Sequence, residues 1–485
     1  MIFNSLDFAV FLPVVFILYW FVFYKNLKQQ NLLIVAASYL FYGWWDWRFL
    51  SLIFFSTVVD FLIGRKLKIE KEHTKRKILL WVSILVNLGF LGFFKYYNFF
   101  LDNFISAFSF FGTEIQVNNL NIILPVGISF YTFQTLSYTI DVYRKKLEPT
   151  EDFIVFAAFV SFFPQLVAGP IERATHLLPQ FTKEKKIKFI NIQFGVIRVL
   201  WGLFKKVVIA DRLALTVNTV YNSPDEFGGI HYIIATILFA FQIYCDFSGY
   251  SDIAIGVARM FNFKLMENFK SPYFSKSLGE FWRRWHISLS TWFRDYLYIP
   301  LGGNRVNTFR MYFNLFLVFV VSGFWHGAQW TFIIWGFVHG IILIIENIVN
   351  TKKLNLDKKK SAFFNFIKII FTFCIVCFAW VFFRANSTND AFLIISNLFD
   401  FSQSLVTITR GMHLYINNPL WKFLGNFLLI CILLLVEFLV IKNKLNEAKI
   451  IKKRPLIRWS IYTSLVLAIL IFGYFEVNQF IYFQF

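Results

Sequence analysis

Long apolar stretches separated by short basic loops recur along the whole chain. Each has roughly 17 to 25 residues, the length a helix needs to cross a bilayer. The pattern therefore predicts an all-α polytopic membrane protein, with about 11 transmembrane helices in a single integral membrane domain over residues 1–485. The clearest apolar runs are 8–24, 47–63, 78–98, 192–210, 329–349, 364–383, 423–441 and 459–477.

Composition agrees with this pattern, because 58% of the 485 residues are hydrophobic and only 16% are charged. Soluble domains are nearer half apolar and about a quarter charged. The formal net charge of +20 resides in loops between apolar runs, as the positive-inside bias requires. We therefore expect contact with membrane lipids and no nucleic-acid partner. The first run has neither a basic leader nor a small-residue cleavage site, so we do not expect a cleavable signal peptide.

Loop charge also predicts the orientation of the chain in the plasma (inner) membrane. Cytoplasmic loops of membrane proteins carry an excess of lysine and arginine. Alternation of the helices then places the N-terminus and the weakly charged connections 99–120 and 384–422 outside the cytoplasm. The strongest basic loops, all predicted to be cytoplasmic, are 65–77, 183–188, 352–360 and 442–454.

The apolar segment 153–168 does not fit the alternation, because basic loops flank it on both sides. Pro164 interrupts it, and "AGPIER" follows. These features favour a re-entrant element, although a tilted hairpin would also fit. Irregular backbone at membrane depth requires surrounding protein or a water-filled cavity, so we expect an internal cavity near 153–173.

Residues 264–310 form the longest polar interruption in the second half of the chain, and we expect them on the cytoplasmic side. Arginines there alternate with Trp282, Trp285 and Trp292, which favours amphipathic helices lying at the membrane interface. A plain surface connector is the alternative. The tight turn "PLGGN" (300–304) ends the segment, and an anionic donor near Arg294 and Arg305 is compatible with these charges.

The hairpin predicted at 311–349 contains a histidine, His326, at the end of a long apolar run. Ionisable groups at such depth are costly, and by default they mark pathways or active sites. A core histidine satisfied by a hydrogen bond is the alternative. Gly323 and Gly327 flank the imidazole on both sides, and we expect them to leave room for a reacting group.

A second histidine, His339, follows 13 residues later. In one continuous helix the two rings would point about 220° apart, unless "HGAQ" is a turn that restarts the helix. His339 shares a helix face with Phe332 and Trp335. Its role stays open between core packing and support of the site.

A histidine suits general-base work at neutral pH because its ordinary pKa lies near 6.5. The sequence contains no metal-ligand spacing and no nucleophile elbow, so the residues indicate an intramembrane proton-transfer site. They do not separate an acyltransferase from a proton-coupled transporter that uses Asp246, Asp252 and the histidines as a relay.

The two histidine motifs resemble the signature of the membrane-bound O-acyltransferase family. They are "FWRRWHISLSTWFRDYLYIPLGGNR" (281–305) and "GFWHGAQWTFIIWGFVHG" (323–340). The resemblance is to the bacterial branch that acts in alginate O-acetylation, peptidoglycan O-acetylation and teichoic-acid D-alanylation. It runs in order along most of the chain and includes "FFPQLVAGPIER" (162–173) and "QIYCDFSGYSDIAIG" (242–256).

The resemblance implies a ring of tilted helices around a central funnel that thins the membrane. It implies that His326 is the catalytic histidine and that His286 is a second histidine important for activity. Supporting or substrate-binding roles would fall to His339, Trp325, Arg294, Asp295, Arg305 and Asn304.

The resemblance also implies the reaction partners. Acetyl-CoA would be the donor substrate, with no bound cofactor or metal, and a periplasmic SGNH-type acetyltransferase would complete transfer to a polysaccharide hydroxyl. An alginate-like exopolysaccharide is the favoured acceptor. Peptidoglycan O-acetylation, D-alanyl transfer to teichoic acid, and transfer to a lipid or protein remain alternatives.

Overall fold

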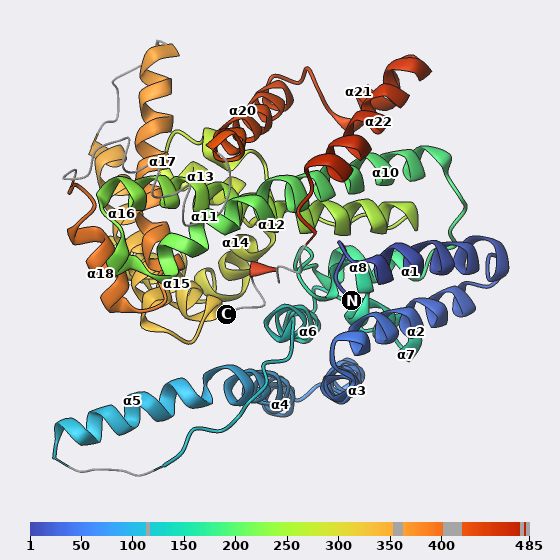
Figure 1. The fold of residues 1–485 in the computed structure, drawn as a ribbon. Coiled ribbons are helices and arrows are strands. Elements are labelled where there is room, and N and C mark those ends of the chain that lie inside the picture. The colour runs from blue at the N-terminus through green and yellow to red at the C-terminus, as the bar shows by residue number, and fades with distance from the viewer. Residues whose placement is uncertain (113–116, 353–361, 401–419, 476–479, 482–485) are drawn as a thin grey trace. The chain divides into compact units, whose positions relative to one another are not determined.

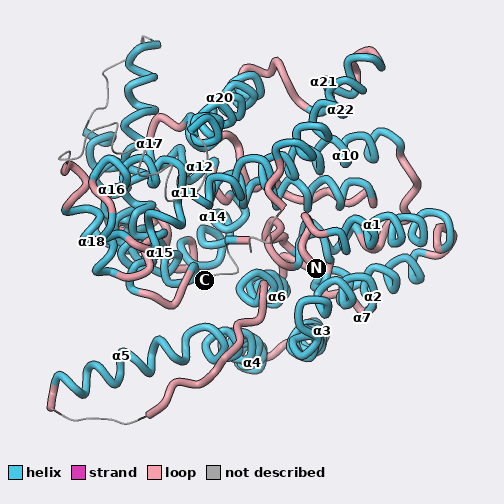
Figure 2. The backbone as a smooth tube through the Cα atoms, in the orientation of Figure 1, coloured by secondary structure: helices cyan, strands magenta, loops and turns pink. Residues whose placement is uncertain are grey.

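A computed structural model describes residues 1–112, 117–352, 362–400, 420–475 and 480–481. Those residues form helices joined by loops (Figures 1 and 2). They contain no strand, which confirms the all-α polytopic prediction. Eight of these helical segments are long and apolar enough to cross a membrane, and the shorter apolar helix Leu6–Val22 precedes them. The count of about 11 stays a prediction. The eight are Leu27–Ile69, His73–Phe110, Gly229–Met260, Thr308–His326, Trp330–Val349, Ala362–Arg384, Leu424–Ile441 and Pro455–Phe472.

The chain divides into two compact units. The first comprises Met1–Val196 and Ala254–Met266, and the second comprises Ile197–Ile253 and Glu267–Phe485. Helices of the first unit are α1 (Leu6–Ile17), α2 (Leu27–Asp46), α3 (Leu50–Ile69), α4 (His73–Leu91), α5 (Tyr97–Phe110), α6 (Ile128–Tyr143), α7 (Phe153–Ser161), α8 (Phe163–Leu166) and α9 (Ala174–Leu177).

The segment predicted to be re-entrant is a broken helix in the first unit. Phe162, with φ −51° and ψ 104°, separates α7 from α8 just before Pro164. All residues of 155–174 are buried, and the ring of Phe162 lies 5.4 Å from that of Phe181 and 4.8 Å from that of Phe263. Aromatic side chains pack against the interrupted backbone, and a cavity at this place stays a prediction.

The second unit holds the remaining helices; α10 begins in the first unit and ends in the second, and α12 begins in the second and ends in the first. The apolar run 192–210 becomes α10 followed by a π-helical segment, and it is not among the eight candidate spans. The helices are α10 (Phe189–Leu203), α11 (Asp211–Asn222), α12 (Gly229–Met260), α13 (Leu278–Arg284), α14 (Ile287–Phe293), α15 (Thr308–His326), α16 (Trp330–Lys352), α17 (Ala362–Arg384), α18 (Thr388–Ser396), α20 (Leu420–Ile441), α21 (Glu447–Ile451) and α22 (Pro455–Phe472).

Several sequence predictions include residues outside the described part of the chain. The basic loop 352–360 lies almost wholly within 353–361, the connection 384–422 includes 401–419, the connection 99–120 includes 113–116, and the run 459–477 includes 476 and 477. The side of the membrane that each of them faces stays a prediction.

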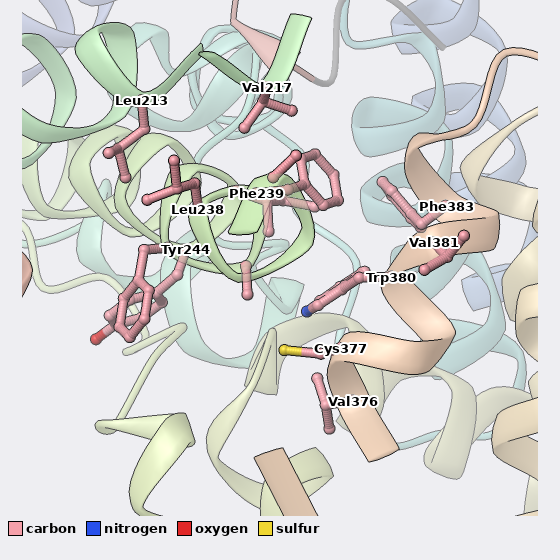
Figure 3. Packing of buried hydrophobic residues seen from close by; sticks show 14 of the residues in the cluster. Leu213, Val217, Leu238, Phe239, Tyr244, Val376, Cys377, Trp380, Val381 and Phe383 are labelled. Carbon is pink, nitrogen blue, oxygen red and sulfur yellow. The ribbon is translucent and has the colours of Figure 1, made fainter. Parts of the chain in front are cut away.

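Aromatic side chains dominate the core of the second unit. Trp285, Trp335 and Trp380 are among its largest fully buried side chains, and the indoles of Trp335 and Trp380 stack with centroids 5.9 Å apart. Phe239 and Phe383 close around Trp380 (Figure 3). His326 and His339 pack against this cluster through Trp335.

Candidate active site

His326 is the last residue of α15, and its side chain lies inside an aromatic enclosure. It is 4% exposed, and its ring centroid lies 5.0 Å from Trp325, 5.1 Å from Trp335 and 5.4 Å from Phe383. All three rings meet the imidazole edge to face, at 72° to 88°. Helices α15, α16 and α17 together therefore hold the imidazole in fixed apolar surroundings.

The glycines beside His326 serve helix packing, so the expectation that they leave open space was wrong. A Cβ on Gly323 would lie 2.2 Å from the backbone oxygen of Phe332, and one on Gly327 would lie 2.2 Å from the Phe332 ring. A Cβ on Gly336 of α16 would likewise lie 2.3 Å from the backbone oxygen of Phe319. Small residues at these positions let α15 and α16 approach closely, as in other membrane helix pairs.

The turn after His326 brings His339 to the same tryptophan. Helix α15 ends at His326 and α16 begins at Trp330, so the restarted helix considered above is what forms. His339 is fully buried, and its ring lies 4.9 Å from Trp335 and 5.1 Å from Trp282. Within the described residues neither of its ring nitrogens has a hydrogen-bond partner.

His286 occupies the junction between α13 and α14 in a strained conformation. Its φ of 42° and ψ of 54° are left-handed, a region that costs a non-glycine residue energy and that clusters at functional sites. The side chain is 1% exposed. Burial lowers the pKa of His286 to about 3, because an apolar environment disfavours the imidazolium. The ring is therefore neutral at physiological pH.

Trp325 connects the two motif histidines. Its indole lies 6.2 Å from the ring of His286 and 5.0 Å from that of His326. Phe247 of α12 covers His286 from another direction, with centroids 4.6 Å apart. The structure thus brings His286, His326 and His339 into one aromatic cluster through Trp325 and Trp335.

The sequence profile of the membrane-bound O-acyltransferase family matches residues 79–388, which include all three histidines of the cluster. The chain belongs to this family. It is an acyltransferase and a multi-pass membrane protein.

Curated relatives of this acyltransferase share much of its length. A probable alginate O-acetylase AlgI of Pseudomonas putida is 44% identical over 83% of this chain and 81% of its own. A peptidoglycan O-acetyltransferase of Helicobacter pylori is 37% identical over 82% and 80%. A teichoic acid D-alanyltransferase of Streptococcus thermophilus is 30% identical over 52% of this chain and 62% of its own.

Asn268 supports His286 in this acyltransferase and was missed by the sequence analysis. It is 1% exposed. Its backbone oxygen accepts the N–H of Ile287 at 3.0 Å, and its Oδ1 accepts both the N–H and the hydroxyl of Ser288, at 3.2 and 2.6 Å. Its amide donates to Ser251 of α12 at 3.2 Å. No local motif marks this residue, because the bonds join segments about 20 residues apart.

Four residues named by the resemblance lie at the surface of the acyltransferase and do not join the aromatic cluster. Arg294 and Asp295 pair with each other at 2.8 Å, with side chains 60% and 34% exposed. Such exposed pairs contribute little to stability. Asn304 and Arg305 are exposed in the turn before α15. The flanking tryptophans Trp285 and Trp292 are instead buried, so the segment 264–310 is anchored in the core.

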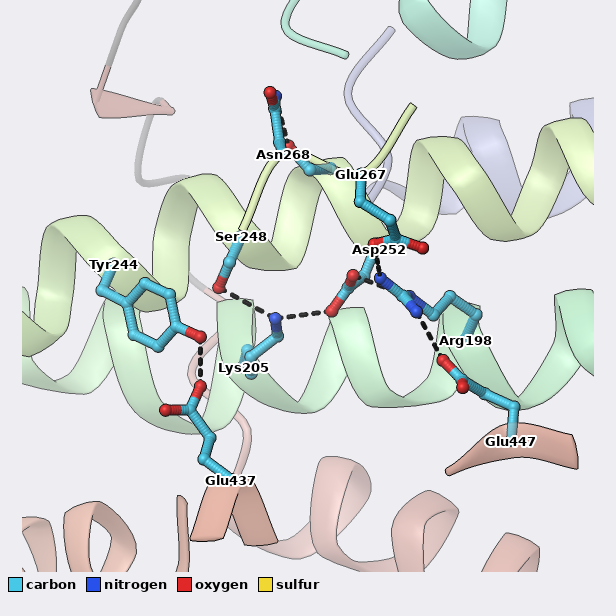
Figure 4. Close-up of polar contacts among 10 residues, drawn as sticks. Arg198, Lys205, Tyr244, Ser248, Asp252, Glu267, Asn268, Glu437 and Glu447 are labelled. Atoms are coloured by element: carbon cyan, nitrogen blue, oxygen red, sulfur yellow. Dashed lines mark hydrogen bonds and ion pairs between the residues drawn. The ribbon is translucent and has the colours of Figure 1, made fainter. Parts of the chain in front are cut away.

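The carboxylates of α12 are engaged in ion pairs, contrary to what a proton relay to the histidines would need. Asp252 binds Arg198 at 2.7 Å and Lys205 (Figure 4). Asp246 binds Lys206 at 2.8 Å and accepts the N–H of Ile481 at 2.9 Å. Buried pairs of this kind are held by their partners, which weighs against the transporter alternative.

Proposed function

We propose that this acyltransferase moves an acetyl group from acetyl-CoA to a hydroxyl of an exported, alginate-like polysaccharide. The observation that carries the proposal is the enclosed imidazole of His326 within the region that matches the family profile. Relatives named as probable alginate O-acetylases, 44% and 42% identical over 83% of this chain, support the acceptor. The 37% identical peptidoglycan O-acetyltransferase supports the second candidate acceptor.

His326 would act as the general base. As the acceptor oxygen attacks the thioester carbonyl, the neutral imidazole takes the hydroxyl proton. The carbon–sulfur bond then breaks, and the imidazolium returns that proton to the leaving thiolate of coenzyme A. The acetyl ester and free thiol are the products, and the histidine ends neutral. General-base catalysis of this kind contributes typically 10²–10⁴-fold.

His286 would position the donor through hydrogen bonding. Burial lowers its pKa to about 3, so it carries no charge with which to bind phosphate. A neutral imidazole still offers one N–H and one acceptor nitrogen, which suits a thioester or the amides of a pantetheine arm. Its left-handed backbone and the bonds to Asn268 keep the ring in place.

The orientation predicted by loop charge supplies the direction of transfer. Acetyl-CoA would approach from the cytoplasm, with the N-terminus on the opposite side of the inner membrane. The attacking hydroxyl would belong to a periplasmic SGNH-type partner, which would then transfer the acetyl group to the polysaccharide. The basic loops support the orientation.

Release of free thiol from acetyl-CoA by the purified protein tests the proposal. His326→Ala should lower turnover by about 10²–10⁴-fold, whereas His231→Ala removes another buried histidine and should leave most activity. Thermal unfolding of both variants checks that they fold. Equal turnover by His326→Ala and wild type would overturn the role of His326. Acetyl transfer to muropeptides and not to alginate oligosaccharides, with the partner present, would overturn the acceptor.

A further inference from the structure

The second unit contains a cavity of about 820 Å³ that the proposed chemistry does not use. Ligand sites commonly have volumes of about 300–1,000 Å³. Residues of α10, α12, α20, α21 and α22 line it, together with part of the segment between α12 and α14. Its lining is partly aliphatic and partly ionic. The aliphatic residues are Ile197, Val436, Val440, Ile441, Leu445, Ile450, Ile461 and Leu465.

Two cations and three carboxylates in the cavity pair with one another. Arg198 binds three carboxylates, those of Asp252, Glu267 and Glu447. Lys205 binds the second oxygen of Asp252 and the hydroxyl of Ser248 (Figure 4). Each of these groups already has an ionic partner in the lining, and the cluster as a whole carries one net negative charge.

Glu437 is the exception. It is 7% exposed, and it lines the cavity from α20. Its Oε1 accepts the Tyr244 hydroxyl, whereas its Oε2 has no hydrogen-bond partner in the described part of the chain. A carboxylate buried without a full set of partners is costly, above all within a membrane helix. The cavity therefore favours a ligand that brings a cationic N–H donor to Oε2.

The cavity lining also contains a cation, Lys270, that would attract an anionic group of a ligand. Lys270 is exposed and has no ion pair within the described ranges. Arg284 also lines the cavity, but its side chain pairs with Glu280 at 2.6 Å. Its backbone oxygen accepts the N–H of Lys270. The groups left to recognise a ligand are thus one carboxylate, one ammonium and an aliphatic wall.

We propose that this cavity binds a phospholipid with a phosphoethanolamine headgroup. The ammonium of the lipid binds Glu437, its phosphate binds Lys270, and an acyl chain lies along the aliphatic residues of α20 and α22. Both helices are candidate membrane spans, so lipid has direct access to them. A phosphatidylglycerol headgroup lacks the cation for Glu437. A phosphatidylcholine headgroup lacks the N–H donors that a carboxylate accepts.

The full chain is purified from vesicles that contain equal amounts of phosphatidylethanolamine, phosphatidylglycerol and phosphatidylcholine. Native mass spectrometry then measures which lipid the protein retains. Wild type should retain phosphatidylethanolamine preferentially. Glu437→Gln keeps the shape and the bond to Tyr244 but removes the charge, and should lower retention at least about tenfold. Lys270→Gln should weaken retention less, because Lys270 is exposed to solvent. Glu267→Gln, at a lining carboxylate already paired with Arg198, is the matched control and should retain the lipid.

Three results would overturn the proposal. They are equal retention of the three lipids by wild type, unchanged retention by Glu437→Gln, and displacement of the lipid by acetyl-CoA at stoichiometric concentration. The last result would assign the cavity to the acyl donor. Thermal unfolding of each variant separates loss of the lipid from loss of the fold.

Discussion

Asn268 accepts two hydrogen bonds from Ser288, one from its backbone N–H at 3.2 Å and one from its hydroxyl at 2.6 Å. Ser288 lies two residues after His286, whose backbone is left-handed. The two hydrogen bonds therefore fix the start of α14, directly after the strained His286 that lies between α13 and α14. Strain of this kind persists only where the surroundings hold it.

Replacing Asn268 with alanine should release this strained junction. The change leaves two buried donors of Ser288 without their acceptor, which costs about 1–3 kcal/mol. Displacement of His286 should lower acetyl-CoA turnover by about ten- to a hundredfold, with KM for acetyl-CoA rising because His286 is proposed to hold the donor. Ser251→Ala removes only the bond to the Asn268 amide and should have a smaller effect. A loss of stability without any change in KM would assign Asn268 a purely structural role.

Gly323→Ala should separate α15 from α16. The new methyl group would lie 2.2 Å from the backbone oxygen of Phe332, and backbone gives way less easily than a side chain. We expect a stability loss of about 1–3 kcal/mol from overpacking and loss of turnover, because His326 ends α15. Gly89→Ala is the control, since a Cβ there meets nothing within 4 Å and alanine favours a helix. Equal behaviour of the two variants in thermal unfolding would contradict the packing argument.

His339→Phe tests whether the third histidine does chemistry. Its ring nitrogens have no hydrogen-bond partner within the described residues, and its neighbours are Trp282 and Trp335. A phenyl ring of similar shape should therefore keep stability within about 1 kcal/mol and turnover within a few-fold. The same substitution at His326 should abolish turnover. Loss of turnover by folded His339→Phe would show that His339 takes part in the reaction.

Acid should destabilise the protein through His286. Its pKa in the folded protein is about 3, whereas an unfolded chain binds the proton near pH 6.5. The unfolded state therefore holds more protons between these values. This contribution to stability is complete above about pH 6.5 and falls as pH decreases, by up to about 1.4 kcal/mol per pH unit.

Thermal unfolding at pH 7.5 and 5.5 measures this effect. His286→Gln should reduce the difference between the unfolding midpoints at the two pH values. Substitution of the exposed His73 should leave that difference unchanged. A midpoint difference that is the same in wild type and His286→Gln would contradict the burial of a neutral imidazole.

The chain's helical, membrane-spanning character follows from the sequence, because it depends on the length and hydropathy of local runs. The runs at 329–349, 364–383 and 423–441 correspond closely to α16, α17 and α20. The interruption at 153–168 was equally visible, since Pro164 follows the residue at which the helix breaks. The run 192–210 is helical as expected, but sequence does not show that Arg198, Lys205 and Lys206 find ion-pair partners on other helices.

For the candidate site too, sequence and tertiary structure supplied different information. His326, His286 and Trp325 could be named from their motifs, because each motif is a contiguous stretch. Their relation to one another depends on the tertiary structure, which makes Trp325 the contact between the histidines and Trp335 the contact between His326 and His339. The glycines of the motif illustrate the difference: sequence suggests free space beside His326, but the neighbouring helix occupies it.

Hydropathy along the chain thus determined which segments are helical, and its motifs named the candidate site residues. Only the tertiary structure decided which buried polar and charged side chains have hydrogen-bond or ion-pair partners. Arg198 receives carboxylates from three separate segments, and Glu437 is left with one oxygen unpartnered among the described residues. The physical reason is that burial and ion pairing depend on residues distant in the sequence, whereas helix formation depends on residues only a few positions apart.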